Sequence, residues 1–212
     1  AAMSELSVSL LVVLLTCLAA AIVLFVSADR RKKKDAALAD YCQSKGYDLS
    51  HERGPLKEAL LIKGPGFTLN AARESRSNED RWRKHTLLTC ERAGGGEPFV
   101  LGSVPSAAGM TALSGPTAEL ALATLRRLYG VPATGAYASL AGPDGRTFVA
   151  FAAEKQGAGA ALFRLEPLLK TWPRDVRLVI RAEGTQAEIE LNDCFPEDVR
   201  ALARLEEIRL AL

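Results

Sequence analysis

The sequence predicts a single N-terminal transmembrane α-helix followed by an α+β domain, in which antiparallel β-hairpins pack with three to four helices. Two observations support this fold class. Residues 6–28 contain no Asp, Glu, Lys, Arg or His. The rest of the chain alternates between apolar residues at helical spacing and short alternating runs that are separated by turn residues.

The apolar segment 6–28 would form a helix of about 34 Å, which is enough to cross a hydrocarbon core of about 30 Å. A cleaved secretory signal has a shorter apolar run and a basic start, whereas only Glu5 precedes this run. Thr16 before Cys17, with further apolar residues beyond, also fits a lipoprotein signal poorly. We therefore expect a retained transmembrane helix preceded by a short segment, 1–5.

A basic run follows the apolar segment directly, as "DRRKKKD" at 29–35. Its five cations are Arg30, Arg31, Lys32, Lys33 and Lys34. Cations gather on the cytoplasmic side of membrane helices. The run is therefore predicted to be a stop-transfer signal. It places segment 1–5 outside and the following domain in the cytoplasm. We expect the membrane to be a bacterial-type inner membrane. We also expect these cations to contact anionic lipid headgroups.

The charge of the remaining chain argues against a nucleic-acid-binding domain. The sequence has 27 Lys and Arg against 25 Asp and Glu. Removing the five cations of 30–34, with Glu5 and Asp29, leaves 22 against 23. A nucleic-acid-binding domain would carry a basic face of its own. The four cysteines are far apart and form no C-x-x-C pair, which favours reduced thiols over disulfides.

The region 36–116 is expected to contain a helix and several strands. Residues 35–46 predict a short helix that ends at Gly46, or a continuation of the transmembrane helix. The break at 64–66 separates two extended segments. Segments 82–92 and 98–104 are predicted to form a β-hairpin about the glycines at 94–96, with loops at 76–81 and 105–116.

The region 117–212 reads as two helix–hairpin blocks and a closing helix, and we expect it to form one compact domain with 36–116. The first helix, 117–130, should bury an apolar face. The residues of that face are Ala118, Ala121, Leu122, Leu125, Leu128 and Tyr129. A hairpin about 143–145 follows. The second helix, 161–172, is expected to kink or divide at Pro167, and a hairpin over 176–191 and a helix over 196–212 complete the chain.

The two helix–hairpin blocks repeat similar residues at offsets of about 40. A duplicated αββ unit that forms a four-stranded antiparallel sheet is one interpretation, and chance similarity between two αββ units is the other. The offset drifts in both directions, which favours chance similarity.

No motif in the sequence predicts catalysis, a cofactor or a metal. His51 and His85 are 34 positions apart, and adding Cys42 and Cys90 gives a set whose spacing does not support a metal site. Neither a G-x-S-x-G elbow nor a phosphate-binding glycine loop is present. We therefore expect a protein that is not an enzyme.

Two weaker features bear on partners. Trp82, Arg83 and Lys84 form the densest basic and aromatic cluster of the domain and could contact a partner, although a strand that begins with a buried Trp explains them more simply. Within the span, the small residues are spaced to admit a second helix. They are Thr16, Cys17, Ala20 and Ala21.

A chain with one span, a modest domain and no catalytic residues is typical of an accessory subunit. We expect a non-catalytic subunit of a larger membrane protein complex, such as a respiratory or photosynthetic one. Its helix would dock against other membrane subunits and its domain would brace the cytoplasmic side. The alternative is a membrane-tethered cytoplasmic module that binds a ligand or a protein.

Overall fold

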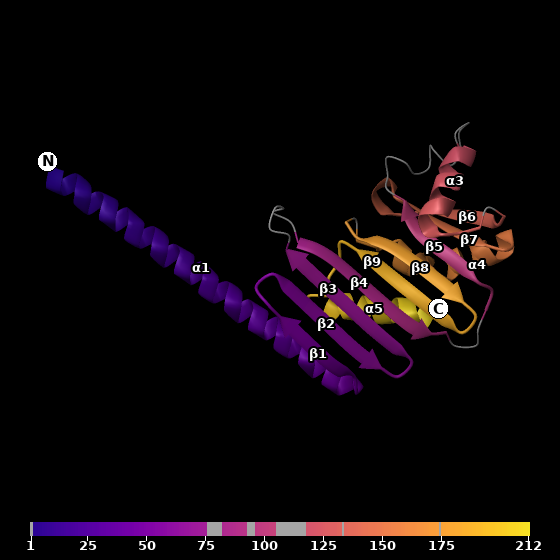
Figure 1. Ribbon diagram of the computed structural model, residues 1–212, viewed down its shortest axis with the longest axis horizontal. Coiled ribbons are helices and arrows are strands. Elements are labelled where there is room, and N and C mark those ends of the chain that lie inside the picture. The colour runs from indigo at the N-terminus through magenta and orange to yellow at the C-terminus, as the bar shows by residue number, and fades with distance from the viewer. Residues whose placement is uncertain (1, 76–81, 93–95, 105–117, 133, 174) are drawn as a thin grey trace.

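The computed structural model describes residues 2–75, 82–92, 96–104, 118–132, 134–173 and 175–212. A long N-terminal helix leads into an α+β domain that is built on one nine-stranded antiparallel sheet, as Figure 1 shows. The fold class predicted from the sequence is confirmed at this level. The four-stranded sheet considered for 117–212 alone is not formed, because the strands of both regions join one sheet.

Helix α1 (Ala2–Lys45) is continuous over 44 residues. Its apolar part projects from the domain as a rod (Figure 1) and is long and apolar enough to cross a membrane. Residues 35–45 form the last turns of this helix rather than a separate element. The helix ends at Gly46, whose φ of +70° suits a residue without a β-carbon. The Tyr47 amide then donates to the Cys42 carbonyl at 2.8 Å.

The sheet has the strand order β1-β2-β3-β4-β9-β8-β5-β7-β6, with every neighbouring pair antiparallel. The strands are β1 (Asp48–Arg53), β2 (Lys57–Gly64), β3 (Phe67–Ser75), β4 (Trp82–Glu91), β5 (Phe99–Val104), β6 (Ala136–Ala141), β7 (Thr147–Ala152), β8 (Arg177–Glu183) and β9 (Gln186–Asn192). Strand β1, with the sequence "DLSHER", was not predicted, because its alternation places polar residues on both faces.

One face of the sheet, which we call the covered face, carries the main core. The last turns of α1 pack on it through Leu38 and Cys42, together with α4 (Lys155–Leu169) and α5 (Val199–Ala211). Figure 1 shows α5 crossing behind the strands. Among the described elements, only α3 (Ala118–Tyr129) covers the opposite face, the open face, and it packs over β5, β7 and β8.

The predicted hairpin of 82–104 is wrong. Both strands exist, but β4 pairs with β3 and β9, whereas β5 lies between β8 and β7. Alternation identifies a strand from local sequence, whereas its partner is chosen by burial of residues that are distant in the chain. The glycines at 94 and 95 and the loops at 76–81 and 105–116 lie outside the described residues.

Three details of the helices also differ from expectation. Leu128 of α3 is 68% exposed, whereas its neighbour Tyr129 is buried and its hydroxyl donates to the Ser103 carbonyl at 3.0 Å. Helix α4 begins at Lys155 and continues through Pro167 to Leu169 without dividing. Pro167 is exposed, so water can reach the carbonyl that its missing amide leaves free.

The closing helix α5 begins at Val199 rather than at 196. Asp198 is its N-cap, and the carboxylate accepts a hydrogen bond from the Ala201 amide at 3.1 Å. The two predicted hairpins at 136–152 and 177–192 are confirmed and share one sheet, with β5 between them. Helices α3 and α4 cover opposite faces, so the two αββ blocks are not placed equivalently.

Candidate functional site: a basic crevice where α1 meets the sheet

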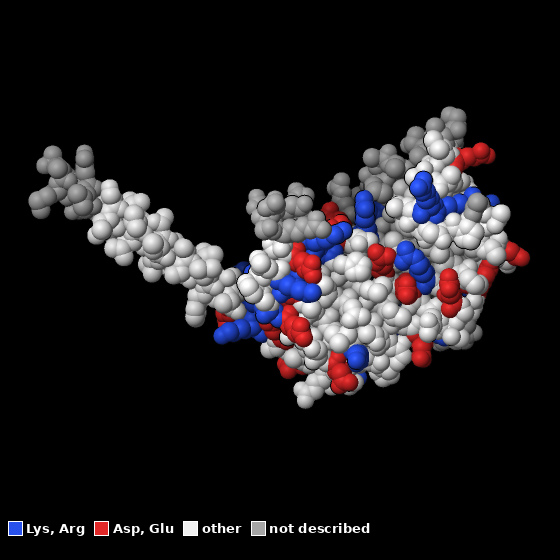
Figure 2. Space-filling model, in the orientation of Figure 1, with Lys and Arg blue, Asp and Glu red and all other residues white. Residues whose placement is uncertain are grey.

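A cavity of about 540 Å³ lies between α1 and the covered face of β1–β4. We call it the juxtamembrane crevice. The residues of α1 that line it are Ser27, Arg30, Arg31, Lys34, Asp35 and Leu38. Figure 2 shows Lys and Arg side chains gathered where the rod of α1 meets the domain. The crevice therefore begins at the end of the apolar segment 6–28 that could cross a membrane.

Helical spacing divides the basic run into two groups. Arg30, Arg31 and Lys34 are separated by one and three residues, so they share one face of α1 and line the crevice. Lys32 and Lys33 lie on other faces and do not line it. Lys33 instead pairs with Asp29 at 2.8 Å, with 76% of its side chain exposed. The five predicted lipid contacts are thus not equivalent.

Glu58 of β2 occupies a core-facing position behind the lining residues His51, Arg53 and Arg73, with only 4% of its side chain exposed. Its Oε1 lies 2.7 Å from His51 Nε2 and 2.7 Å from Arg53 Nη2, and its Oε2 accepts from Arg73. Burial alone would raise the pKa of Glu58. The hydrogen bonds from Arg53, His51 and Arg73 outweigh burial and hold the pKa at about 2.

Arg53 links the Glu58 cluster to α1. Its Nη1 donates to Asp35 of α1 at 2.8 Å while its Nη2 bonds Glu58. These two carboxylates raise the pKa of Arg53. The Arg53 guanidinium therefore links α1 to the sheet through two hydrogen bonds. This link positions the basic residues of α1 over the covered face.

The opposite wall of the crevice combines cations and aromatic rings. Arg73 Nη1 donates to Glu197 at 3.0 Å, and the Arg73 guanidinium lies 5.4 Å from the Trp82 ring centre and 5.1 Å from that of Phe195. Lys84 Nζ is 3.6 Å from Glu197. Trp82 is 40% exposed, so the expectation of a buried Trp is wrong.

The charges that line the crevice do not cancel. Six Lys and Arg residues line the crevice with two Asp and Glu residues, and counting the buried Glu58 behind them still leaves an excess of three positive charges without His51. Within the described part of the chain, Arg30 and Arg31 have no ion pair within 4.0 Å. The mouth of the crevice thus presents cations whose charge is available to an anion.

Two exposed apolar side chains lie beside the crevice at the same end of the sheet. Leu56, in the β1–β2 turn, is 62% exposed, and Trp82 begins β4. The Ser75 amide donates to the Leu56 carbonyl at 2.9 Å, and Ser75 is also the strand partner of Trp82. Since Trp82 and Ser27 line one cavity, this end of the sheet faces the apolar part of α1.

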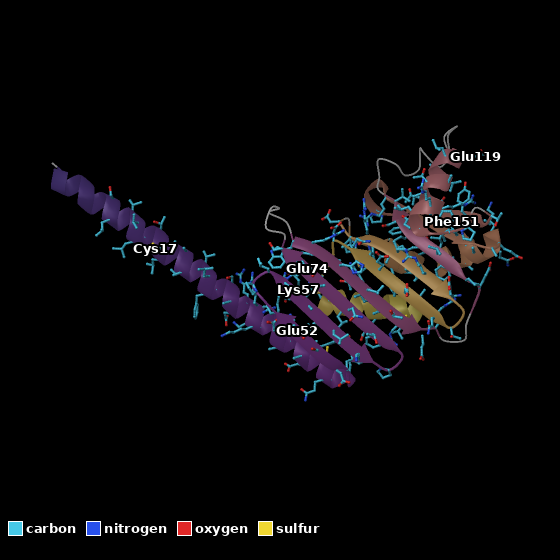
Figure 3. The ribbon with its side chains drawn as sticks, viewed as in Figure 1. Cys17, Glu52, Lys57, Glu74, Glu119 and Phe151 are labelled. Atoms are coloured by element: carbon cyan, nitrogen blue, oxygen red, sulfur yellow. The ribbon has the colours of Figure 1, made fainter. Side chains whose placement is uncertain are left out.

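The open face carries a second, shallower depression of about 350 Å³. Its floor is small or apolar, with Ala59, Leu61, Ala72 and Leu87 on three adjacent strands. Acidic and basic residues are mixed over this face in Figure 2. Figure 3 shows Glu52, Lys57 and Glu74 grouped at the end of β1–β3 that is nearest the rod.

The structure separates several residues that the sequence grouped. Arg83 points to the open face, whereas Trp82 and Lys84 line the crevice, because successive strand residues point to opposite faces. His51 and His85 also lie on opposite faces. In the part of the chain that the structure describes, no three His, Cys, Asp or Glu side chains are grouped so as to hold a metal ion.

The small residues of the apolar rod are exposed and lie on neighbouring turns of α1. They are Thr16, Cys17, Ala20 and Ala21. The Thr16 hydroxyl donates to the Val12 carbonyl at 2.6 Å and is therefore satisfied within the helix. Figure 3 marks Cys17 on the rod, away from the domain. A second helix could approach closely at this face.

The comparisons with known proteins assign no family. No protein-family description, no curated protein and no solved structure matches this chain. Its function must therefore be argued from its own residues.

Proposed function

We propose that this chain is a non-catalytic, single-pass accessory subunit of a larger membrane protein complex. In this proposal α1 crosses the membrane and docks against other subunits, while the α+β domain braces the cytoplasmic side. The basic run supports this orientation, with the N-terminus outside, by the positive-inside rule. A bacterial-type inner membrane with a respiratory or photosynthetic complex is the setting that we favour.

The observation that carries the proposal is the combination of an uncovered rod with a rigid connection. The apolar window of α1 is not buried against any described part of its own chain. The same helix continues without a break into turns that pack on the core through Leu38 and Cys42. A partner that held the rod would therefore fix the position of the domain, as a bracing subunit requires.

The test is extraction of the full-length chain in mild detergent, followed by affinity purification. We expect co-purification of other membrane proteins in fixed stoichiometry. The double variant Ala20→Phe/Ala21→Phe fills the small-residue face of the rod and should reduce partner recovery about tenfold or more. The matched control Leu18→Phe/Ile22→Phe adds bulk elsewhere on the rod and should leave recovery unchanged.

Elution of the chain alone, as a monomer, would contradict the proposal. Equal recovery with both double variants would show that the small-residue face is not the docking surface.

The depression on the open face favours one second candidate, a membrane-tethered module that binds a soluble ligand or protein. Glu52, Lys57 and His85 converge on its small-residue floor. Under this alternative, Ala59→Trp would fill the depression and abolish binding, whereas the rod variants would have no effect. The two sets of variants therefore separate the two functions.

A further inference from the structure

We propose that the juxtamembrane crevice is a binding site for the phosphate of an anionic phospholipid headgroup. This inference rests on α1 crossing the membrane, but it does not require a partner complex. It gives Arg30, Arg31 and Lys34 of the basic run a role in lipid binding, in addition to orientation of the helix.

The depth of the crevice matches the headgroup layer. Arg30 to Lys34 lie two to six residues beyond Ala28, the last residue of the apolar segment, so at about 1.5 Å per residue they stand roughly 3–9 Å past it. The polar layer of a bilayer is about 5–8 Å deep on each side. A lipid phosphate would therefore lie at the level of the mouth of the crevice.

The charge distribution suits an anion better than a cation or a neutral ligand. The carboxylates at the crevice are already engaged: Glu58, behind the lining, by two arginines and a histidine, and Asp35, in the lining, by Arg53. Glu197 is bonded by Arg73. Arg30 and Arg31 have no such partner among the described residues. Their guanidinium groups can bind phosphate oxygens in pairs.

The remaining lining of the cavity is largely apolar and suits the glycerol and upper acyl-chain region of a lipid. Trp82 stands half-exposed beside the cations, and Leu38, Leu60 and Phe195 form an apolar floor. Trp, like Tyr, is enriched at membrane interfaces, because its ring can contact apolar groups on one side and hydrated groups on the other. Leu56 adds an exposed apolar contact at the same end of the sheet.

A soluble phosphate could meet the same cations, so the test must separate the two sources. The full-length chain with Trp172→Phe, which leaves Trp82 as its one Trp, is placed in phosphatidylcholine nanodiscs. These contain an equal mole fraction of brominated phosphatidylglycerol or brominated phosphatidylcholine, with bromine near the glycerol end of the chains. We expect brominated phosphatidylglycerol to quench Trp82 more strongly, and inorganic phosphate at constant ionic strength to leave this preference intact.

The division of the basic run supplies a matched pair of variants. Arg30→Gln/Arg31→Gln should weaken the preference for phosphatidylglycerol by about tenfold or more, because these two cations line the crevice, where they can bind the phosphate oxygens directly. Lys32→Gln/Lys33→Gln removes the same charge from the same run, outside the crevice, and should retain the preference. Both pairs are exposed, and circular dichroism should show an unchanged fold.

Three results would overturn the proposal. Equal quenching by the two brominated lipids would show that the crevice does not select an anionic headgroup. Equal loss in the two double variants would show that the run acts only through its total charge. Removal of the preference by inorganic phosphate would identify free phosphate, not lipid, as the ligand. None of these results depends on whether the chain co-purifies with other subunits.

Discussion

The covered and open faces of the sheet are built from the same strands but hold very different residues. On β4, Leu88 is fully buried under the helices, whereas its neighbour Leu87 lies half-buried on the open face. On β2, the covered-face Glu58 is held by three basic side chains and is 4% exposed, whereas Glu190 on the open face pairs with Arg181 at 3.0 Å and is 25% exposed. The charged cluster of the covered face is thus buried more deeply than that of the open face.

The contrast has a consequence for function. The covered face is occupied by the chain itself over most of its area, and the juxtamembrane crevice opens at its end toward the rod. On the open face the charges of Glu190 and Arg181 are paired with each other, and the described helices cover this face only at the end where α3 lies. A ligand that depends on charge should therefore bind to the crevice, and a broad partner surface to the open face.

The largest expected effect tests the difference in burial directly. Leu88→Ala should lower the free energy of unfolding by about 2–5 kcal/mol, because it leaves a cavity in the core. Leu87→Ala, on the adjacent residue, should lower it by less than about 1 kcal/mol. Urea denaturation of the full-length chain in detergent measures both. Equal losses would mean that the open face is covered in solution.

A smaller effect on stability separates the buried carboxylate of Glu58 from the exposed carboxylate of Glu74. The pKa of Glu58 is lowered from 4.5 to about 2, so the unfolded chain takes up the proton first as the pH falls. The stabilisation is complete above about pH 4.5 and is lost as the pH approaches 2, and it amounts to on the order of 3 kcal/mol. Denaturation midpoints measured across this window should fall in the wild type.

Glu58→Gln should reduce stability at pH 7 by a similar amount and flatten the profile between pH 4.5 and 2. Glu74→Gln is the matched control, because Glu74 pairs with Lys57 at 3.3 Å on the open face and both side chains are more than half exposed. Its effect should be below about 0.5 kcal/mol. An unchanged pH profile in Glu58→Gln would contradict the role assigned to this cluster.

The smallest effect concerns a helix that covers the sheet. Asp198→Ala removes the N-cap of α5 and should cost about 1 kcal/mol. Asp198→Asn keeps a capping oxygen and should cost much less. Thermal unfolding of the two variants compares them. If both lose the same stability, the charge near the helix start, rather than the cap, is the stabilising feature.

Local chemistry predicted much of the fold. The apolar run and its basic end predicted the rod, and glycine and proline positions predicted the turns at 64–66, 143–145 and 184, since these residues restrict or permit backbone angles locally. Strand order could not be predicted in this way. Strand β5 is inserted between β8 and β7 because of long-range burial, and no feature within 99–104 specifies those partners.

The candidate site was predicted only in part. The basic run and Trp82 with Lys84 were identified from sequence, but Glu58, Arg73 and Glu197 were not. A signal existed for Glu58, because it occupies a core-facing position in the alternating segment 57–64, where a charge requires a partner. The partners of Glu58 come from β1 and β3, and one of them, Arg53, also bonds Asp35 of α1, so their convergence depends on the fold.

The unbroken α1 makes the domain a lever. Because the last turns of α1 are packed on the core and linked to the sheet through Asp35 and Arg53, no joint separates the rod from the domain. A change in tilt of the rod, which a bilayer of different thickness imposes on a long apolar helix, would swing the far strands β6 and β7 through the largest arc. Under the proposed membrane topology, a difference in bilayer thickness would therefore displace β6 and β7 more than the rest of the sheet.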